Sequence, residues 1–144
     1  MKIVLDNTIL VRAHERAHGL GRELLTSLVE SKHTLLLSEE ILHELARVLR
    51  YPRLKELFGL TEELVFNYLA VLRRSAEIVT LNPLLTTPIR DVNDVIVVQT
   101  AILGEADILC THDEDFFQEA IVQYLSKHGI NVLDDKALMA RLRS

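Results

Sequence analysis

The chain has few of the residues that cross-link small secreted domains or bind soft metal ions. Its 144 residues include one cysteine, three prolines and no tryptophan. A single cysteine, Cys110, excludes an internal disulfide and a zinc site built from several cysteines, and it fits a reducing compartment. Because Cys110 lies in an apolar run, we expect it in the core.

Long apolar runs are absent too. No stretch approaches the ~20 residues needed to span a bilayer, and Lys2 before three apolar residues is unlike a signal peptide. The hydrophobic fraction is 49%, which allows one core in a chain too short for two ordinary domains. We therefore expect a single domain over residues 1–144, cytoplasmic and with no membrane partner.

Positive side chains are outnumbered by negative ones, and aromatic side chains are scarce. The formal net charge is −5 and aromatic residues make up 5% of the chain. This charge argues against bulk electrostatic capture of nucleic acid, although it is a sum over the whole surface to which one acidic cluster could contribute most. The few aromatic residues provide no ladder on which successive bases could stack.

Strand-like and helix-like segments alternate along the chain, which predicts an α/β fold with a parallel sheet. Plausible N-caps precede several of the helices, at Ser38, Thr61 and Asp134. The predicted strands are Lys2–Leu5, Thr34–Leu37, Glu77–Thr80, Ile108–Thr111 and Asn131–Leu133. The predicted helices are Leu20–Ser31, Glu39–Arg50, Glu62–Ala76, Asn93–Leu103, Asp115–Lys127 and Asp135–Leu142, with a loop at Leu81–Ile89.

Acidic residues follow two of the predicted strands. Asp6 comes directly after Ile3–Leu5, and Asp113 comes shortly after Ile108–Cys110. Ligands of open parallel sheets bind beyond the carboxyl ends of the strands. A helix start also favours acids, and we weigh Asp113 towards function because it closely follows a buried strand. The neighbouring Glu114 is explained by the helix start alone, and His112 is assigned no role.

Glu44 lies in the helix predicted after Ser38. Helical projection places it at the margin of the apolar face, between Ile41 and Val48, so we expect it to be half-buried. Glu39 and Glu40 fall in the solvated first turn, where the helix dipole favours acids. Glu44 is therefore the candidate among the three.

Asp91 and Asp94 open a helix that is apolar on nearly every side. A cap at Asp91 with Asp94 three residues later approximates a capping box, and for Asp91 capping and function have equal weight. Asp94 has the stronger functional case, because a buried helix start needs only one cap.

Taken together, four segments resemble the PIN-domain nucleases, and most closely the VapC-like toxin components of bacterial and archaeal toxin–antitoxin pairs. The segments occur in the family's order and span nearly the whole chain: Ile3–Leu10, Ser38–Arg53, Arg90–Asp94 and Ala106–Phe116.

The resemblance implies a three-layer fold, with a central five-stranded parallel sheet between helices, and a divalent-metal-dependent ribonuclease. The matching site acids are Asp6, Glu44, Asp94 and Asp113. Asp115 and Asp91 match accessory acids. One departure concerns Asn7 and Thr8, since members usually carry Thr or Ser and then Asn after the first aspartate, whereas this chain has the reverse order.

Independently of the family, converging carboxylates without clustered Cys or His favour Mg²⁺ or Mn²⁺ over zinc. We expect Asp6, Asp94 and Asp113 to hold the metal, directly or through water, with Asp115 as a further ligand. Glu44 would hold a water or act as a base. Asn7, Thr8 and Asp91 are accessory candidates.

The expected partners are less directly indicated. Arg47, Arg50 and Arg90 are candidates for binding RNA phosphates, although each could be an ordinary solvated cation. By resemblance, a small antitoxin protein would cover the site. The apolar excess in the helices is compatible with a homodimer.

Two other functions remain open from the sequence. One is an aspartyl-phosphate enzyme or receiver domain, which also places Asp at a strand end; Asp6-Asn7-Thr8 matches the Asp-x-Thr of one such type. That type also needs a phosphate-binding Lys at the end of a later strand, whereas Lys127 and Lys136 lie in predicted helices. The other is a PIN-like domain that binds RNA or protein with little or no cleavage, supported by the reversed Asn7-Thr8 order.

Overall fold

Five parallel strands form the centre of the computed structural model, which describes all 144 residues. They are β1 (Lys2–Leu5), β2 (Thr34–Leu37), β3 (Ala76–Ile78), β4 (Ile108–Cys110) and β5 (Asn131–Leu133), in the order β3-β2-β1-β4-β5. All four pairings are parallel. This confirms the predicted α/β class and its five-stranded parallel sheet.

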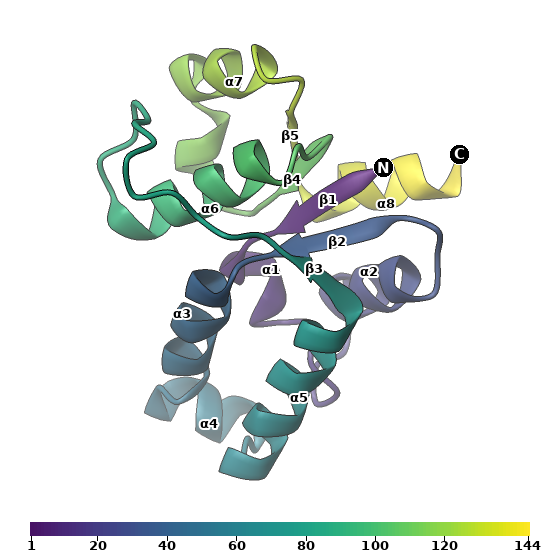
Figure 1. Cartoon of the computed structure of the whole chain (residues 1–144). Coiled ribbons are helices and arrows are strands. Elements are labelled where there is room, and N and C mark those ends of the chain that lie inside the picture. Colours follow the sequence, from purple (N-terminus) through teal and green to yellow (C-terminus); the bar gives the residue numbers. More distant parts are fainter.

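Helices cover both sides of this sheet (Figure 1). α6 packs on β1 and β2, while α2 packs against β2 and α8, and α8 packs against β5. α3, α4 and α5 form a group beside the sheet. The helices are α1 (Asn7–Leu10), α2 (Leu20–Val29), α3 (Glu39–Leu49), α4 (Pro52–Phe58), α5 (Glu62–Ser75), α6 (Val92–Leu103), α7 (Glu119–Ser126) and α8 (Asp135–Arg143), with a 3₁₀ helix, η1, at Glu114–Phe117.

The core is a continuous cluster of 33 buried residues. β1, β2 and β4 are apolar and buried almost throughout, because both faces of the sheet are covered there. Cys110 is fully buried, as predicted, and burial raises the pKa of its thiol. None of the helices is both long enough and apolar enough to cross a bilayer.

The predicted helix starts agree closely with the structure. Ser38 accepts a hydrogen bond from the backbone N–H of Ile41, Thr61 from that of Leu64, and Asp134 from that of Ala137. Each side chain thus satisfies a backbone donor that the first turn of a helix leaves free.

Three differences from the sequence prediction concern the helices. The helix predicted over Asp115–Lys127 is two elements, because Gln118 is extended (φ −65°, ψ 140°) between η1 and α7. The single-turn α1 was not predicted. Neither was α4, which begins at Pro52, because a proline that ends one helix also suits the first position of the next.

Residues 79–91 between β3 and α6 contain no helix or strand. This confirms the loop predicted at Leu81–Ile89, whereas the strand predicted at Glu77–Thr80 is found at Ala76–Ile78. The carboxamide of Gln99 in α6 donates to the backbone oxygen of Leu85 at 2.9 Å. The hydroxyl of Tyr124 in α7 donates to the backbone oxygen of Thr86 at 3.5 Å. These contacts hold the loop across α6 and α7.

We expect Gly104→Ala to destabilise the protein by about 1–3 kcal/mol through overpacking. An added Cβ would lie 2.8 Å from the backbone oxygen of Thr100, and 2.9 Å from methyl groups of Leu36 and Val79. Urea unfolding would measure the loss.

The neighbouring Glu105 is a control for this prediction. Its φ is +55°, a left-handed conformation that glycine adopts without strain. Glu105→Gly should therefore be neutral or slightly stabilising, within ~1 kcal/mol of the parent, because relieved strain offsets added chain entropy. Equal losses in both variants would contradict the close packing described for Gly104.

Candidate functional site

The candidate site lies beyond the carboxyl ends of β1 and β4, the neighbouring strands where the order of the sheet reverses. Asp6 directly follows β1, and Asp113 follows β4 by three residues. This is the position at which open parallel sheets bind ligands.

Asp6 is almost fully buried, with 4% of its surface exposed. Burial raises the pKa of its carboxyl group, and hydrogen bonds from Thr111 and Thr8 act in the opposite direction. The hydroxyl and backbone N–H of Thr8 donate to Oδ1, while the hydroxyl of Thr111 donates to Oδ2. Both carboxylate oxygens are therefore held by the protein.

Asn7 and Thr8 are the accessory candidates that follow Asp6, and only Thr8 donates hydrogen bonds to its carboxylate. The hydroxyl oxygen of Thr8 also accepts a hydrogen bond from the backbone N–H of His112 at 2.8 Å, which links α1 to the segment after β4. The amide of Asn7 lies 3.5 Å from the backbone oxygen of Ile41, and its side-chain oxygen is buried without a partner. Asn7 and Thr8 stand in the reverse of the order usual in the PIN-domain nucleases, yet a hydroxyl group still lies beside Asp6.

Thr111 is a site residue that the sequence analysis missed. It is fully buried, donates to Asp6, and accepts a hydrogen bond from the backbone N–H of Asp113 at 2.9 Å. A hydroxyl residue at the end of a buried strand, two positions before an acid, was an available signal.

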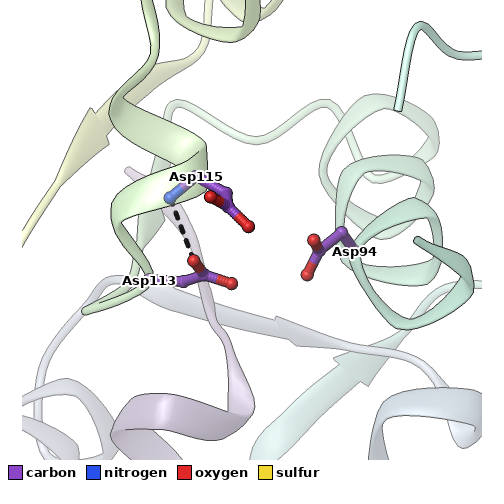
Figure 2. A group of neighbouring side chains, drawn as sticks. All are labelled: Asp94, Asp113 and Asp115. Atoms are coloured by element: carbon purple, nitrogen blue, oxygen red, sulfur yellow. Dashed lines mark hydrogen bonds between the residues drawn. The ribbon is translucent and has the colours of Figure 1, made fainter. Parts of the chain in front are cut away.

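Three carboxylates come together near the buried Asp6. One oxygen each of Asp94, Asp113 and Asp115 lies within 4.8 Å of the other two. Figure 2 shows Asp94 on α6 facing Asp113 and Asp115 across a common space. Asp113 also caps η1 by accepting from the backbone N–H of Asp115 at 3.0 Å. The carboxylate of Asp113 therefore both caps η1 and belongs to the acid cluster.

Burial and the neighbouring acids together raise the pKa of Asp94 to about 6. Burial is the largest cause, followed by repulsion from Asp113, Asp91 and Asp115, with a smaller effect from Asp6. Like charges that converge in a partly buried site disfavour ionisation. Asp91 itself caps α6, accepting from the backbone N–H groups of Asn93 and Asp94.

Glu44 is half-buried as expected, with 19% of its side chain exposed, but it does not join the three-acid cluster. Its two oxygens accept hydrogen bonds from the guanidinium of Arg47, which also lies against the ring of Tyr51. Glu44 lines a separate groove with Asn93 and Ile96, between the starts of α3 and α6.

The three candidate phosphate-binding arginines have different surroundings. Arg47 is paired with Glu44, and Arg50 donates to both oxygens of Glu62. Arg90 is exposed and takes part in none of the ion pairs, which leaves its charge free near the acids.

His112, which received no role from its sequence, connects the site to the C-terminal helix. Its Nε2 lies 2.9 Å from an oxygen of Asp135, in the first turn of α8. Since the backbone N–H of His112 contacts Thr8, this bond helps to hold the segment that carries Asp113 and Asp115.

A pocket of about 290 Å³ adjoins the acids. Asp94 and Asp115 form part of its lining, together with the loop before α6, Phe116 of η1 and the beginning of α7. The lining is Pro88, Ile89, Arg90, Asp91, Asp94, Asp115, Phe116, Gln118 and Ile121.

The donor set of the cluster fits a hard divalent cation. Mg²⁺ and Mn²⁺ prefer carboxylate and water oxygens, and Mg²⁺ commonly uses one or two carboxylates with waters and substrate phosphate. The cluster contains no histidine or cysteine. Repulsion among the three acids is the kind of interaction that a bound cation relieves.

Comparison with known proteins identifies the class. The sequence model of the PIN domain family matches residues 2–115, and the chain therefore belongs to that family. Among solved structures, it is similar to VapBC2 from Rickettsia felis, crystallised with a DNA fragment from the promoter of that pair. The TM-score is 0.61 at 17% sequence identity, covering 93% of this chain and 98% of that one. No curated protein sequence matches the chain.

We expect Thr111→Val to cost about 1–3 kcal/mol, because it leaves a buried carboxylate oxygen of Asp6 without its donor. Thr34→Val, at the start of β2, makes the same exchange in a side chain that bonds to no acid and should change stability by less than ~1 kcal/mol. Equal urea midpoints for the two variants would disprove the role of this hydroxyl.

We expect Asp94→Asn to raise the melting temperature at pH 7.5 in EDTA. Since the folded pKa is raised above the unfolded value, the folded state holds more protons between pH 4 and 6, and stability falls as pH rises through that window. Asn removes this loss. After allowance for solvent screening, the gain should be about 2–4 °C, equivalent to ~1 kcal/mol.

At pH 4 this gain should disappear, since Asp94 is then largely protonated in the folded protein. Glu63→Gln, an exposed first-turn acid of α5, is the control and should shift the melting temperature little at either pH. A gain from Asp94→Asn that does not depend on pH would contradict the repulsion described here.

Proposed function

We propose that this PIN-domain protein is a divalent-metal-dependent endoribonuclease and the toxin of a toxin–antitoxin pair, acting in the cytoplasm. The observation that carries the proposal is the cluster of Asp94, Asp113 and Asp115 at the carboxyl ends of the central strands. Family membership and the fold shared with VapBC2 support it.

In this proposal the clustered acids bind Mg²⁺ or Mn²⁺, and Asp6 completes the site from behind. Because the oxygens of Asp6 already accept hydrogen bonds from Thr8 and Thr111, we assign it contact with the metal through water. The bound ion would activate water and stabilise charge on the scissile phosphate and leaving oxygen.

The remaining roles follow from position. Because the pKa of Asp94 is raised to about 6, a cation that binds at the cluster displaces a proton from Asp94 below about pH 6. Arg90, exposed beside the acids, would bind RNA phosphate. Glu44 would act as a base or hold a water only after separating from Arg47.

The proposed protein partners would bind exposed apolar side chains of the α4–α5 region. Leu57 is 67% exposed and Phe66 is 71% exposed. Surface of this kind is available to an antitoxin or to a second copy of the chain in a homodimer.

A binding-only PIN domain is the second candidate function. It is favoured by one observation, that Glu44 is neutralised by Arg47 and stands outside the acid cluster. The aspartyl-phosphate alternative is less well supported, since the carboxylate of Asp6 is buried and its oxygens already accept hydrogen bonds.

Cleavage of labelled single-stranded RNA with Mg²⁺, Mn²⁺ or EDTA tests the proposal. We expect cleavage only with metal, and a rate at least about 100-fold lower in Asp6→Asn, Asp94→Asn and Asp113→Asn, equivalent to ~3 kcal/mol of transition-state stabilisation. Asparagine retains the capping oxygen of Asp113, so the loss would come from charge rather than from unfolding.

Glu114→Gln is the matched control, because Glu114 is an exposed acid of η1 outside the cluster. Its activity should remain close to that of the parent. Absence of cleavage with every metal, accompanied by RNA binding in a gel-shift assay, would favour the binding-only domain. Cleavage that is unaffected by the aspartate substitutions would refute the assigned site.

A further inference from the structure

The pocket beside the acids has a composition that the metal site does not explain. Ile89, Phe116 and Ile121 supply apolar surface, while Arg90 and Gln118 bring polar groups. Gln118 is exposed at the junction of η1 and α7, where its side chain makes no capping hydrogen bond. These groups face a space that also opens onto Asp94 and Asp115.

The pocket is built by a supported loop. Pro88, Ile89 and Arg90 form one wall, and the two hydrogen bonds from α6 and α7 hold the loop at the preceding residues Leu85 and Thr86. Gln118 and Ile121 contribute lining from the beginning of α7. A cavity of this kind is available before any ligand binds, which reduces the entropic cost of binding.

Its size and chemistry select the class of ligand. At about 290 Å³ it lies at the lower end of ligand pockets, which suits one planar ring system rather than a longer molecule. Apolar walls suit the faces of a heteroaromatic ring, and the polar side chains can bond its edge. Arginine and amide side chains are common partners of unpaired RNA bases, both by stacking and by hydrogen bonding.

The position of the pocket beside the acid cluster narrows the class of ligand further. Because Asp94 and Asp115 belong to both the acid cluster and the lining of the pocket, a phosphate held at the cluster would place its attached nucleoside near the opening. Negative charge from the acids disfavours a second phosphate in the pocket itself, whereas an uncharged base has no such penalty.

Resting on the proposed nuclease function, we propose that this pocket binds one unpaired nucleobase of the RNA strand, next to the phosphate that is cut. Gln118 bonds the edge of the base, Ile89 and Ile121 contact its faces, and Arg90 contacts the adjoining phosphate. The pocket thereby requires a single-stranded nucleotide at this position and gives cleavage its base preference.

The test is sequencing of the cut sites that the protein leaves in a randomised single-stranded RNA with Mn²⁺. We expect a preferred base at one position beside the cut. Gln118→Ala should weaken that preference about 3- to 10-fold, the effect of losing one hydrogen bond to the base. Ile121→Trp should weaken it at least as much by filling the pocket.

Matched controls lie on the same helix. Gln123→Ala and Val122→Trp make the same exchanges at exposed positions outside the pocket, and the cut-site preference should not change. Circular dichroism of Ile121→Trp verifies that it folds. Cleavage with no base preference, or with a preference that the pocket variants leave intact, would overturn the pocket while leaving the nuclease proposal standing.

A second measurement applies if the protein does not cleave RNA at all. Adenosine, guanosine, cytidine and uridine, which carry no phosphate, are titrated into ¹⁵N-labelled protein, and the side-chain amide signal of Gln118 is followed by NMR. A shift with at least one nucleoside, absent in Ile121→Trp, would support the pocket although the nuclease proposal had failed. No shift with any of them would overturn the pocket as well.

Discussion

The burial of the Asp6 carboxylate at the end of the central strand is the constraint on which the site depends. A buried carboxylate is costly unless polar groups bond it, and the hydroxyls of Thr8 and Thr111 do so. The same hydroxyls accept from the backbone N–H groups of His112 and Asp113. One network thus joins α1 to the segment after β4 and positions Asp113, whose carboxylate in turn caps η1.

Most of the fold could be predicted because its signals are local. Lys2–Leu5, Thr34–Leu37 and Asn131–Leu133 are strands with the predicted bounds, and the capping residues Ser38 and Thr61 marked helix starts. The one-turn α1 is too short for a periodic pattern to show. The break at Gln118 could not be predicted either, since α7 has helical spacing and no proline or glycine marks the interruption.

The candidate site was only partly predictable from the sequence. Parallel strands bring their carboxyl ends to one edge, so the proximity of acids after β1 and β4 follows from the topology. Helix periodicity correctly placed Glu44 at the margin of a buried face. Periodicity could not show that Arg47, one turn later, forms an ion pair with the carboxylate of Glu44. The pocket was beyond sequence reasoning, because its walls come from a loop and a helix that are brought together by tertiary contacts.

The clustered carboxylates come from α6 and from η1 with its N-cap. Gln118 and Ile121, which line the neighbouring pocket, come from the beginning of α7. Substitutions in α7 can therefore reshape the pocket without altering any clustered carboxylate.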